Sequence, residues 1–196
     1  MEAMARPREF DRADALTRAM HLFWQQGYER TTLKDLTRAM GISAPSLYNA
    51  FGDKKALFEE ALALYLTTPA VVVPHAVGAS TARDVVATIL DVAVREYGST
   101  EHPPGCFVIS DPILDEHRRD GLETIRTRLR QAHDEGDLPA DADVDALTDY
   151  VDVVLRGLSS RARDGADAAI LRAVAEVALN AWPAAGRTGY VTDSSC

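Results

Sequence analysis

Apolar residues recur at intervals of three and four along most of the chain, which is the spacing of one face of an α-helix. The pattern predicts helices over residues 9–26, 33–40, 44–51, 54–65, 81–97, 116–135, 142–163 and 166–182. The apolar segment 106–114 is short, and Pro112 limits any helix within it. No stretch alternates between apolar and polar residues as a half-buried strand would. The sequence therefore predicts an all-α fold of about nine helices.

The ends of the first predicted helices carry residues that stop or start helices. Gly27 and Gly41 follow the first two segments, and glycine readily adopts the left-handed backbone that ends a helix. Thr32, Ser43 and Asp53 precede the next three, where a side-chain oxygen can cap free backbone N–H groups. Four helices are therefore expected in close succession in the first third of the chain.

Residues 33–51, LKDLTRAMGISAPSLYNAF, have the layout of a helix-turn-helix. Leu36, Met40 and Leu47 are spaced to lock two short helices together, with Gly41 at the turn. In such a unit the second helix presents its N-terminal residues to the major groove of DNA, and its free N–H groups favour phosphate. An ordinary helical hairpin with a glycine turn has the same outline, so the spacing alone leaves both interpretations open.

A longer stretch, residues 6–66, resembles the DNA-binding region of the tetracycline-repressor (TetR) family of bacterial transcription regulators. The shared features, in chain order, are Phe23-Trp24, Gly27-Tyr28, Thr31-Thr32, Leu36, Gly41-Ile42-Ser43, Leu47-Tyr48, Phe51, Lys54 and Leu57. The resemblance implies an N-terminal helix-turn-helix DNA-binding domain and a helical domain that binds ligand and dimerises. We expect these domains at residues 1–55 and 56–182, with a disordered tail at 183–196.

The resemblance also implies which side chains contact DNA. The implied phosphate contacts are Thr31, Thr32, Ser43, Ser46, Tyr48 and Lys54. The residues implied to face the bases are Ala44, Pro45 and Asn49. Thr37 stands where the family usually has alanine, and Asn49 and Ala50 replace larger aromatic or histidine residues. We therefore expect readout by Asn49, by thymine-methyl contacts and by DNA shape, rather than readout copied from a relative.

Charge is distributed unevenly along the chain. The net charge is −9, which by itself argues against a nucleic-acid partner. Residues 1–55, however, hold nine basic and seven acidic residues, whereas residues 56–196 hold twelve and twenty-three. The three lysines, Lys34, Lys54 and Lys55, all lie in the first segment. The charge therefore indicates that the N-terminal segment contacts DNA and that the acidic remainder is repelled by it.

Composition limits the remaining classes. Apolar residues make up 46% and charged residues 26%, as in ordinary globular proteins. No uncharged apolar run is long enough to span a membrane, and the N-terminus lacks the apolar region of a secretory signal. Cys106 and Cys196 do not form a disulfide framework, so the cytoplasm is the expected compartment.

By the same resemblance, the helical domain is expected to bind an unknown small-molecule inducer and to form a homodimer. The candidate ligand-binding residues are Tyr65, Tyr97, His102, Cys106, Phe107, His117 and Tyr150. Each of them also has an ordinary interpretation as a packing or surface residue. The last two predicted helices carry apolar residues on more than one face, which indicates that they bury two sides and implies a dimer interface like that of the family.

Cys106 follows Gly105 and precedes a short apolar segment, and a Gly-Cys pair at this place is typical of one branch of TetR-like regulators, some of which sense electrophiles or oxidants. In the first turn of a helix, the backbone N–H groups would lower the pKa of the Cys106 thiol. The alternative is a buried structural cysteine, a common place for this residue type.

Other classes of function have less support. The five histidines show no metal-binding spacing, and no phosphate-binding glycine motif is present, so no metal, cofactor or enzymatic activity is expected. A thiol enzyme built on Cys106 and His117 would lack a group to orient the pair. A helical small-molecule-binding protein without DNA binding stays open. The favoured hypothesis is a ligand-responsive repressor that binds a near-palindromic operator as a homodimer and is released by a small molecule.

Overall fold

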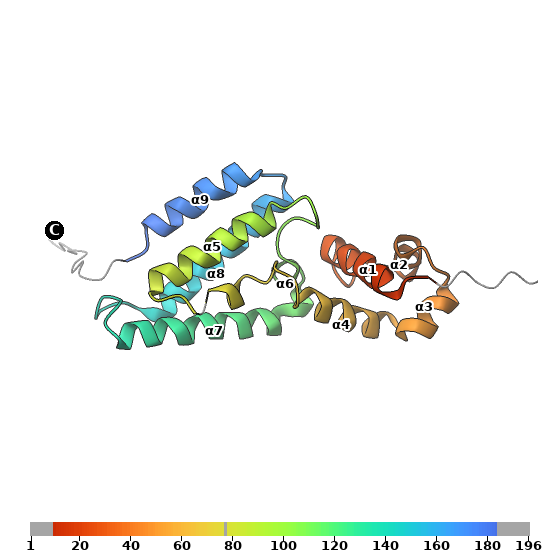
Figure 1. Cartoon of the computed structure of the whole chain (residues 1–196), viewed down its shortest axis with the longest axis horizontal. Helices are drawn as coiled ribbons and strands as arrows, with labels where there is room; N and C mark the ends of the chain where they lie inside the picture. Colours follow the sequence, from red (N-terminus) through yellow and green to blue (C-terminus); the bar gives the residue numbers. More distant parts are fainter. Residues whose placement is uncertain (1–9, 77, 184–196) are drawn as a thin grey trace, which may run out of the picture. The chain divides into compact units, whose positions relative to one another are not determined.

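The computed structural model describes residues 10–76 and 78–183. Within this part, the chain forms nine α-helices and two short 3₁₀ turns and contains no strand (Figure 1). The chain folds into two compact units, of which the first ends at Thr68 and the second begins at Pro69. The all-α prediction is therefore confirmed. The tail expected at 183–196 lies outside the described residues apart from Pro183.

The first unit contains four helices: α1 (Arg12–Gln26), α2 (Leu33–Met40), α3 (Ala44–Phe51) and α4 (Lys54–Tyr65). Helix α1 packs against both α2 and α4. The contact with α4 includes two edge-to-face ring pairs, Phe23 with Phe58 and Trp24 with Tyr65, each with ring centres 5.0 Å apart. Because these rings fix α4 on α1, the first unit extends to Thr68 rather than ending at residue 55 as the sequence suggested.

Helix α1 shows how local chemistry sets a boundary. The periodicity predicted a start near residue 9, but the helix starts at Arg12 because the Asp11 carboxylate accepts hydrogen bonds from the N–H groups of Ala13 and Asp14. The helix buries one face, which consists of Ala15, Ala19, Met20, Phe23 and Trp24.

The second unit contains the remaining elements. They are η1 (Val73–His75), α5 (Ala82–Tyr97), α6 (Phe107–Ser110), η2 (Pro112–Leu114), α7 (Asp115–Asp134), α8 (Val144–Arg163) and α9 (Ala168–Asn180). Helix α5 packs on α8 and α9, and α7 packs on α8 (Figure 1). Helix α6 has a single turn because Asp111, which precedes Pro112, is extended and caps the next turn instead.

Helices α8 and α9 carry apolar side chains both inward and outward. Val151, Leu155 and Leu158 of α8 are buried in the unit. Large apolar side chains of the same two helices face outward, with exposed fractions between 45% and 70%: Val153, Ile170, Val174 and Val177. The two helices are therefore apolar on more than one face, as their sequence predicted. No helix in the described ranges has the length and apolar character that a membrane crossing requires.

Candidate nucleic-acid interface

The turn between α2 and α3 is built around Gly41. Its backbone has a φ of +68°, the left-handed region that glycine adopts at little cost. The N–H groups of Gly41 and Ile42 both donate to the Thr37 carbonyl, which ends α2 and turns the chain. Leu36 and Leu47, one on each side of the turn, are fully buried. The two short helices are thereby held at a fixed angle to each other.

Helix α3 leaves one face open. Its inner side is anchored by Leu47 and Phe51, which are buried. At its start, Ser43 Oγ accepts the Ser46 N–H at 3.2 Å and lies 2.8 Å from the Ser46 hydroxyl. The predicted DNA contacts on this helix are exposed, apart from the half-buried Ser46: Ser43, Ala44, Pro45, Tyr48 and Asn49. The structure therefore places six of the sequence-predicted residues together on α3 and at its N-cap.

The two threonines before α2 differ in exposure. Thr31 is 1% exposed, and its hydroxyl donates to the Gly27 carbonyl at 2.7 Å, so its side chain does not reach the surface as a phosphate contact would require. Thr32 is exposed and caps α2, and Asp35 accepts the N–H of Thr32 in return. This hydrogen bonding, led by the Thr32 hydroxyl, lowers the pKa of the Asp35 carboxyl. Of the two, only Thr32 is exposed, and its hydroxyl and N–H both donate to the Asp35 carboxylate.

Lys54 begins α4, and its ammonium lies 4.2 Å from the centre of the Tyr28 ring. Tyr28 itself belongs to an aromatic cluster with Phe23 and Phe58, at centre distances of 6.2 and 4.8 Å. The neighbouring Lys55 instead pairs with the Glu59 carboxylate at 3.7 Å. The sequence motif named Lys54 but did not reveal that an aromatic face holds it, because 26 positions separate the two residues.

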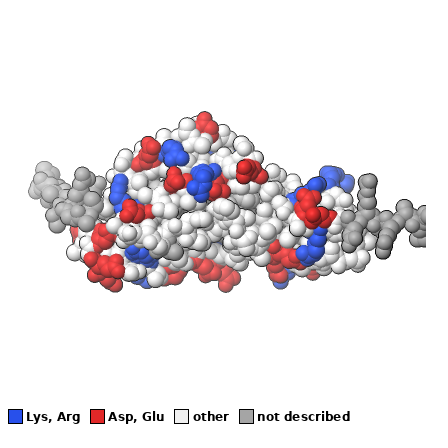
Figure 2. Space-filling view, in the orientation of Figure 1, with Lys and Arg blue, Asp and Glu red and all other residues white. Residues whose placement is uncertain are grey.

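Charge on the visible face is mixed rather than concentrated. In Figure 2, acidic and basic side chains alternate over the surface, with wide areas that carry neither. The candidate contacts on α3 are neutral side chains, so the interface offers hydroxyl, amide and backbone N–H donors, with Lys54 as its cation.

In the second unit, Gly105 and Cys106 lie tightly against α8. Gly105 has a φ of +80°, and a Cβ placed on it would lie 2.8 Å from Ser159 Oγ. The Cys106 N–H donates to that same oxygen at 2.9 Å. Cys106 is 8% exposed and caps the single-turn helix α6 rather than lying within a helical turn. Ser159 therefore fixes this segment on α8, a contact that no sequence motif indicates.

Tyr97 and Phe107 are the candidate ligand residues buried beside Cys106. Both are fully buried. Burial raises the pKa of Tyr97 well above its ordinary value, and the neighbouring Cys106 and Asp152 add to the shift. The Tyr97 hydroxyl therefore keeps its proton at neutral pH and lies next to the Cys106 thiol.

The other candidate ligand residues lie elsewhere. Tyr65 is buried against Trp24 in the first unit. His102 lies in the loop after α5, with Nδ1 3.0 Å from the Pro103 carbonyl and Nε2 3.4 Å from Glu96 Oε2. His117 is exposed on α7, and the Tyr150 hydroxyl donates to the Ala178 carbonyl of α9 at 2.7 Å. The structure therefore does not bring the seven candidates into one site.

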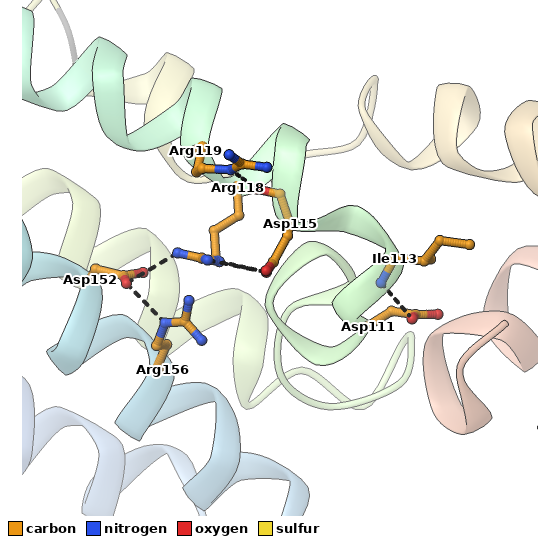
Figure 3. Close-up of polar contacts among 7 residues, drawn as sticks. All are labelled: Asp111, Ile113, Asp115, Arg118, Arg119, Asp152 and Arg156. Atoms are coloured by element: carbon orange, nitrogen blue, oxygen red, sulfur yellow. Dashed lines mark hydrogen bonds and ion pairs between the residues drawn. The ribbon is translucent and has the colours of Figure 1, made fainter. Parts of the chain in front are cut away.

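A half-buried ion-pair network joins α7 and α8 (Figure 3). Arg118 lies between Asp115 and Asp152, at 3.1 and 3.3 Å, and Arg156 reaches the same Asp152 oxygen at 2.9 Å. Two guanidinium groups thus share one carboxylate. Asp152 and Arg156 are four positions apart on one helix, so the sequence alone indicates that they can pair. The contact of Arg118 with α8 depends on how the two helices pack.

One hollow of about 530 Å³ lies open on α7, lined by Asp120, Glu123, Thr124, Thr127, Arg128 and Gln131. None of the candidate ligand residues lines it. Within residues 10–76 and 78–183, no three side chains of histidine, cysteine, aspartate or glutamate are grouped as metal ligands would be.

Comparisons with known proteins agree with this geometry. Residues 15–61 match the family model described as bacterial regulatory proteins of the tetR family. The HTH-type transcriptional repressor ComR of Escherichia coli K12 is 32% identical over 198 residues, which cover 93% of each chain. The repressor BdcR of the same strain is 31% identical over 172 residues, covering 82% of this chain and 83% of its own.

Among solved structures, a cysteine-substituted form of the TetR-family transcriptional regulator CifR, complexed with 26-bp double-strand operator DNA, is 41% identical with a TM-score of 0.80. The similarity covers 91% of this chain and all of that chain. Two findings thus coincide: a helix-turn-helix whose second helix has an exposed face, and similarity to these regulators over 82–93% of the chain. The chain belongs to the TetR family of bacterial transcriptional regulators.

Proposed function

We propose that this regulator represses transcription by binding a near-palindromic operator as a homodimer, with α3 of each protomer in the major groove. The observation that carries the proposal is the open face of α3. Leu47 and Phe51 hold the helix from behind, while Ala44, Pro45 and Asn49 face outward. This is the arrangement that lets the N-terminal half of a recognition helix reach base edges. The similarity to CifR, whose structure is a complex with 26-bp double-strand operator DNA, supports binding to duplex DNA.

The contacts divide by chemistry. Ala44 and Pro45 offer methyl and methylene groups, which suit the thymine methyl, and Asn49 offers an amide that can pair with adenine. Phosphate oxygens would accept from the side chains around this face: Thr32, Ser43, Ser46, Tyr48 and Lys54. Thr31 is left out because its hydroxyl is buried.

The dimer would form through α8 and α9. Val153, Ile170, Val174 and Val177 expose apolar surface that an isolated protomer would leave in water. A two-fold arrangement of these helices would bury it and separate the two recognition helices by about one turn of DNA. The small-molecule inducer would act by binding more tightly to a conformation in which that separation is wrong.

Part of the expected inducer site is supported by burial. Tyr97, Cys106 and Phe107 lie close together in the second unit and offer a hydroxyl, a thiol and a ring. Tyr65 packs against Trp24 in the first unit, His117 is exposed, and His102 and Tyr150 have polar partners of their own in Glu96 and the Ala178 carbonyl, so we retain only the first three as candidates. The relatives named above are transcriptional regulators, which supports a function without catalysis.

A second candidate function is regulation through the Cys106 thiol. Cys106 is 8% exposed and lies beside the buried Tyr97 hydroxyl, so a group added to the sulfur would have to displace its neighbours. Iodoacetamide tests this in a Cys196→Ser background: a C–S bond forms, iodide leaves and the thiol proton passes to solvent. DNA release on modification, absent in Cys106→Ser, supports the thiol function. Alkylation no faster than that of a model thiol rejects it.

Selection from a random DNA library tests the main proposal. The wild-type protein should enrich a palindrome with half-sites about one helical turn apart. Asn49→Ala should relax the preference at one position in each half-site. If no palindrome is enriched, the main proposal is rejected, and the result supports the alternative of a helical small-molecule-binding protein that does not bind DNA. A sequence preference left unchanged by Asn49→Ala rejects the role of that residue.

A further inference from the structure

Lys54 carries a positive charge at the N-terminus of α4, where the helix dipole disfavours a cation. It is the first residue of α4, and the positive end of the helix dipole lies at that terminus. No carboxylate among the described residues forms an ion pair with it, whereas the adjacent Lys55 pairs with Glu59. The ammonium instead lies 4.2 Å from the centre of the Tyr28 ring. The negative face of this ring is the group that fixes the cation there.

Tyr28 is itself immobilised by its surroundings. It follows Gly27, whose φ of 81° ends α1. Its ring is stacked on Phe23 and meets the edge of Phe58, and both of these residues are buried. The ring that contacts the Lys54 ammonium is therefore held in place by the packed core of the first unit.

We propose that Tyr28 is a positioning residue of the DNA interface. Its ring holds the Lys54 ammonium at the place where it contacts a DNA phosphate. The assignment rests on the proposed function, in which Lys54 contacts the DNA backbone. A carboxylate partner would neutralise the ammonium and would have to be displaced by DNA. An aromatic face leaves the charge intact and the outward N–H groups free, because it contacts only one side of the ammonium.

The test is a double-mutant cycle on the selected operator, measured over a series of salt concentrations. Lys54→Met should lower the salt slope of binding by about 1 per protomer, as expected for one lost phosphate contact. Tyr28→Leu should weaken binding about two- to fivefold. Tyr28→Phe keeps the ring face and should bind like the wild type. In the Lys54→Met background, Tyr28→Leu should have almost no further effect.

A matched control and a spectroscopic readout separate positioning from simple loss of packing. In the Lys55→Met background, Tyr28→Leu should cost as much as in the wild type, because Lys55 does not contact the ring. Without DNA, ring current should shift the Lys54 side-chain proton signals upfield in the wild type and in Tyr28→Phe, and the shift should vanish in Tyr28→Leu.

The outcomes distinguish a failure of the positioning role of Tyr28 from a failure of DNA binding. If the wild type binds the operator but the losses from Tyr28→Leu and Lys54→Met add fully, Tyr28 acts through packing alone and the assignment is overturned. An absent ring-current shift overturns it as well. If the wild type binds no DNA, the proposed function itself fails, and the positioning role fails with it.

Discussion

Arg12 and Glu60 join the first turn of α1 to α4, with Arg12 Nη2 2.9 Å from one carboxylate oxygen and 2.7 Å from the other. The same nitrogen donates to the Ala50 carbonyl at 3.2 Å, in the last turn of α3, and the guanidinium carbon lies 4.4 Å from the centre of the Phe51 ring. One side chain thus holds three helices of the first unit together.

Arg12→Gln should therefore destabilise the protein by about 1 kcal/mol, since the pair is half exposed and solvent screens it. Arg18→Gln is the matched control, because Arg18 pairs with Asp14 on the same helix and should cost only about 0.3–0.5 kcal/mol. Urea unfolding measures both. Equal effects would show that Arg12 does not fasten α3.

Gly105→Ala should destabilise the second unit strongly. The left-handed backbone alone costs about 1–2 kcal/mol for alanine, and the new Cβ would meet Ser159 Oγ at 2.8 Å and the Ser159 carbonyl oxygen at 2.9 Å. Gly136→Ala is the control, since Gly136 has a φ of +79° but open space around it. Thermal unfolding should show an excess loss of about 1–3 kcal/mol for Gly105→Ala. No excess would contradict the close packing on α8.

Asp35 should give the first unit part of its stability at neutral pH. Its pKa is lowered from the usual 3.8, first by the Thr32 hydroxyl and next by the Thr32 N–H, so folding favours the ionised carboxylate. The contribution is therefore fully present above pH 3.8 and is lost as the pH falls through the lowered value. Comparing the acid unfolding of the wild type with that of Asp35→Ala measures it. The two stability curves should converge at low pH, and parallel curves would exclude this role.

Val177→Glu should break the proposed dimer. Val177 is 70% exposed, and a carboxylate there would be desolvated against its counterpart in a two-fold interface. Thr127→Glu, on the exposed surface of α7, adds the same charge outside that surface. Sedimentation velocity should find a dimer for the wild type and for Thr127→Glu and a monomer for Val177→Glu. A dimeric Val177→Glu protein would place the interface elsewhere.

Much of the helical framework could be predicted because its determinants are local. Capping side chains at Thr32, Ser43 and Asp53 set the starts of α2, α3 and α4 where the sequence indicated. Gly27 and Gly41 end α1 and α2 for the same local reason. The exposure of Ala44, Pro45 and Asn49 on α3 agrees with what the resemblance to the family implied.

What could not be predicted depends on how the helices and their connections pack, which no motif or periodicity reveals. The burial of Thr31 follows from its hydrogen bond to Gly27 and from the packing around it, not from its position in a motif. Lys54 meets Tyr28, and Gly105 meets Ser159, only after the helices have packed. Tyr65 belongs to the first unit because its ring meets Trp24 there, which no periodicity reveals.

The most direct test of the central claim is the affinity of the wild-type protein for its selected palindrome as a function of salt. Binding by two recognition helices that contact phosphates releases counterions, so the logarithm of the affinity should fall linearly with the logarithm of the salt concentration, by about 0.9 per phosphate contacted. A scrambled duplex should bind far more weakly at every salt concentration. Binding that is insensitive to salt, or equal for palindrome and scrambled DNA, would contradict the account.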